Sequence, residues 1–325
     1  MICIKFDGDI TDGADSVEDA MGGAQRELIS LAALLCAEGE VRVYLKTRQQ
    51  WRHGDVHVLP VEEFTWDVLD STAVYIGNLL LADDYPRVRQ CLYQWIDYAE
   101  IHGDVDLVIT DTWRGKIKYT GQGRDAVVLF PYVEPNCGAD ERDASKILFV
   151  GAIHGGKRPD LAIEAMSLLP NYTLHVIGRA GNPQYFGQQG VDADAAYYQQ
   201  CRDVAGDNVV FRGELPYSEM LREMQTASAI IIPYCSVNEF NTNVALEAIS
   251  NGCVPVVADG LVDYLSDRAC IRLPNQQWLS PEHIADIFLS QKSNLEEIRL
   301  NAMTVAGGIA NYCKGEMIRA ILGKT

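Results

Sequence analysis

Two glutamates lie close together in a polar stretch between two apolar runs, where they could bind hydroxyl groups. Glu239 and Glu247 are separated by seven residues, and the run Asn241-Thr242-Asn243-Val244 lies between them. Asn and Thr begin helices, so free backbone N–H groups are expected here. Such a helix start carries about half a positive charge and suits a phosphate. A phosphate beside hydroxyl-binding carboxylates suits a nucleotide sugar, although a solvated loop glutamate and a surface helix glutamate could also have this spacing.

The flanking sequence predicts the elements that would position these glutamates. Residues 229–233 and 254–258 are short β-branched runs, which predict two buried strands. Apolar residues three and four positions apart predict a helix between them, which Asn251–Gly252 ends. Strand, loop, helix and strand in this order make one parallel crossover unit. Its loop is expected at the ligand-binding edge of a sheet.

A second candidate phosphate site follows the predicted strand at residues 147–150. Gly151, Gly156 and Lys157 fit a P-loop pattern, but Arg158 stands where that pattern needs a Ser or Thr to hold magnesium. Glycines at a helix start together with a lysine can cradle a phosphate in either case. The alternative is an ordinary glycine-rich turn with a surface lysine.

A glycine pair near the amino terminus has the same two interpretations. Gly22 and Gly23 follow the predicted strand 2–6 and open a predicted helix. Glycine allows the backbone to approach a phosphate closely, but it also serves in a simple helix-start turn. Asp7 and Asp9 could form a metal-binding pair. An acidic loop is the favoured interpretation, and no metal site is predicted.

Strands and helices are expected to alternate through the whole chain. Further strands are expected at 41–45, 56–59, 73–76, 107–110, 127–130, 173–177 and 209–211, and further helices at 62–70, 87–98, 112–120, 160–169, 218–225, 281–289, 294–306 and 310–322. Residues 131–144 read as a linker and residues 178–196 as a long loop. Repeated strand–helix units predict an α/β protein with doubly wound, Rossmann-like parallel sheets.

Together the motifs resemble retaining glycosyltransferases of family 4, which have the GT-B fold. The segment Glu239-Phe-Asn-Thr-Asn-Val-Ala-Leu-Glu247-Ala is similar to their E-x7-E motif. Lys157 falls on a lysine that clamps the donor diphosphate, whereas Ala152 replaces the accompanying arginine. The runs Val176-Ile177-Gly178 and Phe211-Arg212-Gly213 match in order, but the predicted strand at 73–76 lacks the histidine common in the family.

The resemblance implies a role for each matching residue. Glu239 faces the donor sugar, Glu247 takes the ribose hydroxyls, and the backbone around Arg212 borders the base. Lys157 stabilises the leaving diphosphate, and either Arg158 or Arg212 supplies a second positive charge.

The resemblance also implies a domain plan of two Rossmann-like domains facing a cleft. Residues 1–133 form the acceptor-side domain and residues 134–290 bind the nucleotide-sugar donor. The helices of residues 291–325 cross back to the first domain. A chain of 325 residues is long enough for two such domains.

Composition limits the partners. A net charge of −18 argues against nucleic acid, and no run is long and apolar enough for a transmembrane segment. Nine scattered cysteines and the absence of a signal-peptide pattern favour free thiols in the cytoplasm. No pattern indicates an oligomeric state.

The implied function is a retaining hexosyl- or other glycosyltransferase that needs neither a metal nor another cofactor. It would move a sugar from a nucleoside-diphosphate sugar to a hydroxyl of a carbohydrate or other acceptor. Two alternatives remain open. The missing arginine and histidine favour a non-catalytic nucleotide-sugar-binding relative, and the pattern from Gly151 to Lys157 favours a P-loop-like nucleotide hydrolase.

Overall fold

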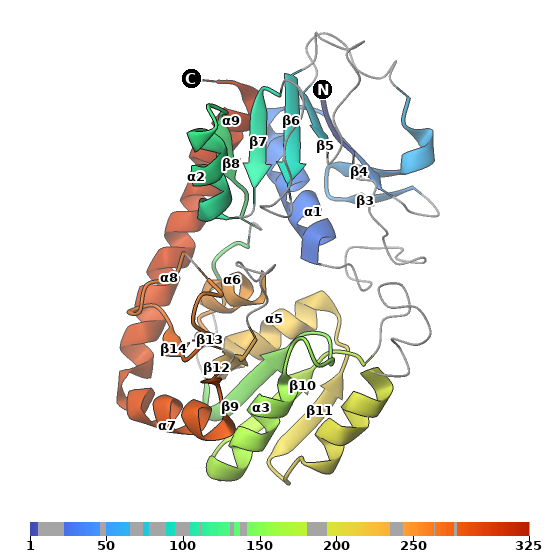
Figure 1. Cartoon of the computed structure of the whole chain (residues 1–325). Coiled ribbons are helices and arrows are strands. Elements are labelled where there is room, and N and C mark those ends of the chain that lie inside the picture. The colour runs from blue at the N-terminus through green and yellow to red at the C-terminus, as the bar shows by residue number, and fades with distance from the viewer. Residues whose placement is uncertain are drawn as a thin grey trace. The chain divides into compact units, whose positions relative to one another are not determined.

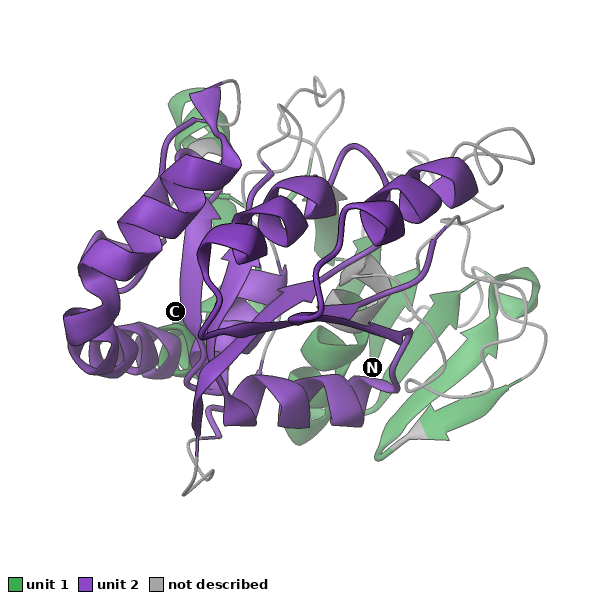
Figure 2. Ribbon diagram, turned by 90° about the horizontal axis from the view of Figure 1, so that it is seen from below, with its two compact units in different colours: residues 1–132, 309–325 green, residues 133–308 purple. Residues whose placement is uncertain are grey.

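The computed structural model describes most of the chain and divides it into two compact units. The described residues are 1–5, 23–45, 50–65, 74–77, 89–94, 105–110, 112–130, 133–136, 142–180, 194–234, 243–262, 264–275 and 278–324. Unit 1 comprises Met1–Tyr132 with Ile309–Thr325, and unit 2 comprises Val133–Gly308 (Figure 2). Each unit has its own sheet.

The sheet of unit 1 has the strand order β3-β4-β2-β1-β5-β6-β7-β8 among the described residues (Figure 1). The strands are β1 (Ile2–Lys5), β2 (Val41–Leu45), β3 (Trp51–His53), β4 (Val56–Pro60), β5 (Val74–Gly77), β6 (Arg89–Gln94), β7 (Leu107–Thr110) and β8 (Ala126–Val128). All neighbours are parallel except β3 and β4. Parallel strands are normally covered on both faces, and successive residues such as Val108 and Ile109 are fully buried.

Helices α1 and α2 pack on the strands of unit 1. Helix α1 (Gly23–Leu35) contacts β1, β2 and β4 and continues into a 3₁₀ turn at Cys36–Glu38. Helix α2 (Trp113–Gly121) contacts β7 and β8. The Oγ1 of Thr112 caps α2 by accepting a hydrogen bond of 2.8 Å from the Gly115 N–H.

Two helices expected in this part of the chain are corrected. Val61–Glu63 is only a 3₁₀ turn, and Phe64 is already extended, so the described part of the expected helix 62–70 is wrong. The helix expected at 87–98 is also wrong where it is described, because Arg89–Gln94 is strand β6. Its central residues Cys91 and Leu92 are both buried. A strand buried on both faces has no alternation of apolar and polar residues to separate it from a helix.

One helical run closes the chain where two helices were expected. Helix α8 (Leu295–Tyr312) leads through a π-helical turn (Cys313–Met317) into α9 (Ile318–Leu322). The division between the units falls within α8, after Gly308. Within unit 1, the Tyr312 hydroxyl donates to the Val128 carbonyl at 3.1 Å, and Arg89 donates to the Ala320 and Ile321 carbonyls at 2.8 Å each. No helix in the described part of the chain has the length and hydropathy of a membrane span.

The sheet of unit 2 has the order β11-β10-β9-β12-β13-β14, with parallel neighbours throughout the described strands. Its strands are β9 (Asp143–Val150), β10 (Thr173–Ile177), β11 (Val209–Gly213), β12 (Ala227–Ile232), β13 (Val254–Ala258) and β14 (Ile271–Leu273). The chain builds outward from β9 to β11 and then returns beside β9 with β12. In open α/β sheets the carboxyl ends of the strands at such a reversal form the ligand-binding crevice.

Helices cover both faces of the second sheet. They are α3 (Pro159–Ala165) with a 3₁₀ turn at Met166–Leu168, α5 (Tyr217–Thr226), α6 (Asn243–Ser250) and α7 (Pro281–Gln291). Residues 194–203 are also helical, so the last positions of the loop expected at 178–196 already belong to a helix. Phe149 and Val176 belong to a buried cluster that also contains Leu161 of α3 and Phe288 of α7, and α5 contacts β9 and β12.

Candidate functional site

Three glycines stand at the carboxyl ends of neighbouring strands in unit 2. Gly151 follows β9, Gly178 follows β10, and Gly213 ends β11. The Gly151 N–H donates to the Ile177 carbonyl at 3.0 Å, and the Gly178 N–H donates to the Gly213 carbonyl at 2.8 Å. All three have positive φ angles, of 153°, 147° and 71°. A Cβ on Gly178 would collide with the Gly151 backbone, whereas a Cβ on Gly213 would meet nothing within 4 Å, so the backbone at Gly213 can be approached closely by a bound group.

The turn after Gly151 is held by its own backbone and by one histidine. The Gly156 N–H donates to His154 Nδ1 at 3.1 Å, and the Lys157 N–H donates to the His154 carbonyl at 3.0 Å. A Cβ on Gly156 would lie 2.8 Å from the His154 ring. The Ile153 N–H also donates to the Arg179 carbonyl at 2.9 Å. These contacts join the connections after β9 and β10 and fix the backbone that presents Lys157.

The side chain of Lys157 contacts a residue just after β12, the strand that neighbours β9 on the side away from β10. Its Nζ lies 4.0 Å from the ring centroid of Tyr234. Tyr234 follows β12 and is only 2% exposed. The ammonium group thus lies where the connections after β9 and β12 meet, which is the reversal point of the sheet. Sequence reasoning found Lys157 but missed Tyr234, because the only signal was an aromatic residue just after a predicted strand.

Arg158 is held by a carboxylate from the same turn. It adopts the left-handed backbone conformation (φ 52°, ψ 44°), and no other described non-glycine residue has a positive φ. Its guanidinium donates to both Asp160 oxygens, with Nε–Oδ1 at 3.0 Å and NH2–Oδ2 at 2.9 Å. This hydrogen bonding raises the pKa of Arg158. The Tyr197 hydroxyl also donates to Asp160, so α3 is tied to the helix at residues 194–203.

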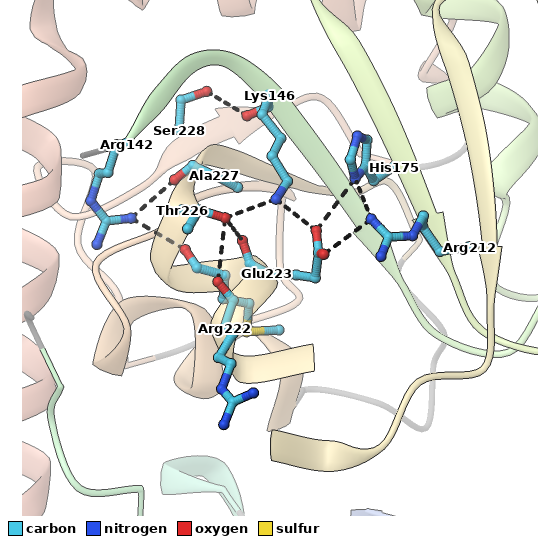
Figure 3. A network of polar contacts seen from close by, with 10 residues as sticks. Arg142, Lys146, His175, Arg212, Arg222, Glu223, Thr226, Ala227 and Ser228 are labelled. Atoms are coloured by element: carbon cyan, nitrogen blue, oxygen red, sulfur yellow. Dashed lines mark hydrogen bonds and ion pairs between the residues drawn. The ribbon is translucent and has the colours of Figure 1, made fainter. Parts of the chain in front are cut away.

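Arg212 belongs to a polar network on β9, β10, β11 and α5. Its NH1 lies 3.1 Å from Glu223 Oε1, while Lys146 Nζ lies 2.6 Å from Glu223 Oε2. His175 Nδ1 is 3.3 Å from the same Oε2 (Figure 3). Both arginines that could supply a second positive charge are therefore paired with carboxylates in this structure. A sequence pattern could not show these pairs, because Glu223 reaches Arg212 only through the packing of α5.

The charges of this network shift the pKa values of its members. Burial by itself would raise the pKa of Glu223, but hydrogen bonding to Lys146 and the nearby positive charges hold that pKa below its usual 4.5. Burial, reinforced by Lys146, holds the pKa of His175 below its usual 6.5. Lys146 and Arg212 therefore face an ionised carboxylate at neutral pH.

Helix α6 carries the second glutamate of the sequence motif. Asn243 and Val244 begin this helix, and Glu247 is only 2% exposed. Because α6 follows β12 in a parallel unit, its first turn lies toward the carboxyl edge of the sheet. A carboxylate buried this deeply must interact with polar groups, and hydroxyl donors satisfy that need. The expectation that Glu247 lies on a solvated helix surface is thereby excluded.

The far end of α6 is fixed by a glycine and an arginine. The Gly252 N–H donates to the Ile249 carbonyl at 3.2 Å, and the Cys253 N–H donates to the Ala248 carbonyl at 2.9 Å. This pair of bonds is a Schellman motif, and the φ of 69° at Gly252 fits it. Arg142 donates to the Asn251 carbonyl at 2.7 Å. The helix that carries Glu247 is therefore anchored at its carboxyl end.

Several predicted site residues cannot be placed. Glu239, Asn241, Thr242 and Gly22 lie outside the described residues, and Gly23 is the first residue of α1. The structure does bring Gly151, Gly156, Lys157 and Arg158 together on one connection of unit 2. Within the described ranges, no three His, Cys, Asp or Glu side chains gather closely enough to hold a metal ion.

Comparison with known proteins gives both a family match and a fold. Residues 139–269 match the family model of Glycosyl transferases group 1. No curated protein matches the sequence. Among solved structures, the chain is similar to sucrose-phosphate synthase from Thermosynechococcus elongatus (14% identity, TM-score 0.68, covering 100% of this chain and 98% of that one). It is also similar to Anabaena Alr3699/HepE in complex with UDP (14%, 0.68, 98% of each chain). A glycosyltransferase from Rickettsia africae is similar at 10% identity (0.64, 100% and 99%).

These likenesses confirm the fold class that the sequence predicts. At such low identities they establish the fold alone, and the family match covers the part of the chain that carries the glycines, Lys157 and Glu247. The match covers less than half of the chain, all of it within unit 2. The chain thus has the GT-B fold with two Rossmann-like domains, and its residues 139–269 are similar to Glycosyl transferases group 1.

Proposed function

We propose that the protein is a retaining glycosyltransferase. It transfers a sugar from a nucleoside-diphosphate sugar to a hydroxyl of a carbohydrate or other acceptor. The observation that carries the proposal is the position of Lys157. Its ammonium group lies against Tyr234 at the reversal point of the sheet, on the connection that begins with Gly151, in a domain that matches the group 1 family. A positive charge and approachable backbone at this edge suit a diphosphate.

The neighbouring structures suggest which donor to test first. Anabaena Alr3699/HepE is described in complex with UDP, with UDP and glucose, and with UDP-glucose. These complexes support a uridine diphosphate donor, with UDP-glucose as the first candidate. Unit 2 would bind the donor, and unit 1, with the helices that follow residue 308, would form the acceptor-side domain.

The proposed reaction is a front-face displacement. The bond between the anomeric carbon and the diphosphate oxygen breaks, and a bond from the acceptor oxygen to the same face of that carbon forms. The proton of the acceptor hydroxyl passes to the leaving diphosphate. Lys157 and the first turn of α6, which begins at Asn243 and Val244, stabilise the charge that builds on the diphosphate. No metal takes part in the proposed step.

The two glutamates have separate roles in the proposal. Glu239 positions the donor sugar and stabilises the positive charge that develops on it. Glu247 accepts hydrogen bonds from the ribose hydroxyls, a role that its burial on α6 supports. For the second positive charge we favour Arg158 over Arg212, because Arg158 is next to Lys157 on the same turn whereas Arg212 lies on β11, two strands from β9.

Thermal melting of the purified chain tests the donor site. UDP, GDP, ADP, TDP and CMP are each added with and without magnesium. A bound ligand at about 100 times its Kd adds about 2.7 kcal/mol and raises Tm by about 5–11 °C for units of this size. We expect a metal-independent rise with one nucleoside diphosphate. Magnesium-dependent release of phosphate from ATP or GTP would instead favour the P-loop-like hydrolase.

Product analysis then tests transfer itself. The chain is incubated with the matching nucleotide sugar and a panel of acceptors, and the released diphosphate and the anomeric configuration of the product are measured. We expect retention of configuration. Glu239→Ala should abolish transfer while the diphosphate still raises Tm. Transfer that survives this substitution would remove Glu239 from the mechanism.

A second candidate is a non-catalytic relative that only binds nucleotide sugars. Ala152 in place of an arginine and the pairing of Arg158 with Asp160 favour this alternative. Such a protein would melt at a higher temperature with UDP-glucose but release no UDP from it with any acceptor or with water.

A further inference from the structure

The contact between Lys157 and Tyr234 joins two connections that are far apart in sequence. Lys157 lies on the turn after β9, and Tyr234 lies just after β12. The ammonium nitrogen is 4.0 Å from the ring centroid, well within the distance of about 6 Å at which cation–π attraction acts. Since Tyr234 is 2% exposed, its ring is fixed by packing and offers a rigid surface to the lysine.

An aromatic ring and a carboxylate can both hold a lysine in place, but they do so with different effects on its charge. Lysine has a long flexible stem, and ordering it costs rotamer entropy. Asp160 and Glu223 each hold an arginine by an opposite charge, which partly cancels the charge of that arginine. The aromatic face of Tyr234 attracts the ammonium without bringing a negative charge. A phosphate arriving at this edge therefore meets an ammonium that the ring helps to orient.

We infer that Tyr234 is a positioning residue that sets the affinity for the diphosphate part of the donor by holding Lys157 over the reversal point. The inference rests on the proposed function, because it concerns the same donor site. It adds a residue that no sequence motif identifies, and it assigns that residue to recognition of the diphosphate rather than of the base.

The test compares UDP with uridine as probes for isothermal titration. The ratio of the two Kd values isolates the contribution of the diphosphate. Tyr234→Phe keeps the ring and should keep the ratio. Tyr234→Leu removes the ring and should weaken UDP binding by about tenfold, the size of a partly desolvated cation–π contact, while uridine binding stays unchanged. Tyr234→Met also lacks a ring, and its longer, more adaptable side chain can fill the site differently, so it serves if the leucine variant fails to fold.

A double-mutant cycle shows whether Tyr234 acts through Lys157. Lys157→Met should weaken UDP binding, and adding Tyr234→Leu to it should change the Kd for UDP by less than about twofold. Tyr172→Leu is the matched control. Tyr172 is a buried tyrosine in the same unit with Lys292 lying 5.5 Å from its ring centroid, and it precedes β10 at the opposite edge of the sheet. This control should lower stability without changing the ratio.

The outcomes separate the inference from the proposed function. Equal UDP affinity in the wild type, Tyr234→Leu and Tyr234→Met, or additive effects of Tyr234→Leu and Lys157→Met, would overturn the role of Tyr234 while leaving the donor site intact. Equal loss of UDP and uridine binding would show a merely structural role and overturn it as well. A wild-type chain that binds no nucleoside diphosphate would overturn the proposed function and the inference with it.

Discussion

A Cβ on Gly178 would lie 1.8 Å from the carbonyl oxygen of Gly151. The backbone of the connection after β10 thus lies directly against that after β9, and the φ of 147° at Gly178 is also unsuited to an L side chain. We expect Gly178→Ala to destabilise unit 2 by about 3 kcal/mol and to abolish UDP binding, because the two connections must separate. Urea unfolding followed by circular dichroism measures the first effect, and titration with UDP measures the second.

Gly308→Ala is the control for that substitution. Gly308 lies in α8, where a Cβ would meet nothing within 4 Å. Alanine favours a helix by about 1 kcal/mol over glycine, so this variant should be more stable than the wild type and bind UDP equally well. If Gly178→Ala were as stable as Gly308→Ala, the close packing of the two connections would not exist in solution.

The carboxylates that pair with Arg158 and Arg212 could not be predicted from sequence patterns. Spacing alone placed Gly151, Gly156 and Lys157 on one turn, because glycines and a lysine after a buried strand form a local motif. Asp160 lies only two residues beyond Arg158, yet the pattern gave no sign of their pairing. Glu223 reaches Arg212 from another element altogether. Such partners depend on packing, which single-sequence periodicity does not contain.

The same distinction applies to the fold. The β-branched runs 41–45, 107–110, 173–177 and 254–258 are strands with the expected bounds, because short buried runs between turn residues have few alternatives. Strand β6 was not predicted because the apolar residues around Cys91 and Leu92 have a spacing that also fits a helix. Its pairing with β5 and β7, which makes it a strand, cannot be read from the local sequence. The continuity of α8 across residues 307–309 was missed because Gly307 and Gly308, which disfavour a helix, looked like a break.

Because Arg158 has a left-handed backbone conformation, we expect glycine to be more stable than alanine at this position. Arg158→Gly and Arg158→Ala both lose the contacts to Asp160, so they differ mainly in backbone strain. We expect the glycine variant to be more stable by about 1 kcal/mol, because glycine adopts a φ of 52° without a Cβ clash. Urea unfolding compares the two.

Glu164 gives the matched comparison for Arg158 in the interior of α3. There the order should reverse, with Glu164→Ala about 1 kcal/mol more stable than Glu164→Gly, since the helix favours alanine. The same order at both positions would show that Arg158 does not keep its left-handed conformation in solution.

The burial of Glu247 predicts a change in ribose recognition. Glu247→Gln replaces a carboxylate by a weaker acceptor at constant size, so UDP binding should weaken by about tenfold. Binding of 2′,3′-dideoxyuridine diphosphate, which lacks both ribose hydroxyls, should be weak and equal in the wild type and the variant. Titration of both nucleotides against both proteins measures this.

Glu219 supplies the control for Glu247. It is an exposed glutamate in α5, and Glu219→Gln should leave the affinity for both nucleotides unchanged. A loss of dideoxynucleotide binding as large as that of UDP in Glu247→Gln would mean that Glu247 supports the fold of the site and does not contact the ribose.

The polar network around Glu223 predicts how the stability of unit 2 depends on pH. Its other members are Lys146, His175 and Arg212. The pKa of His175 is lower in the folded protein than its usual 6.5, so the unfolded chain binds more protons as pH falls. The contribution of neutral His175 to the free energy of unfolding is full above pH 6.5, and it is lost as pH falls through the folded pKa of His175. The lowered pKa of Glu223 adds a second loss, which begins near its usual 4.5 and continues as pH falls through its folded pKa.

Two variants distinguish the pH range in which His175 titrates from the range in which Glu223 titrates. Thermal melts between pH 8 and pH 4 measure both. His175→Asn should flatten the change in Tm that begins near pH 6.5 and leave the steeper fall below 4.5. Glu223→Gln should lower Tm at pH 8, where about 2 kcal/mol of stability is lost because Lys146 and Arg212 then face a neutral amide. It should also remove part of the fall below 4.5. A Tm profile of His175→Asn that parallels the wild type down to pH 5 would contradict the assignment of the upper pH range to His175.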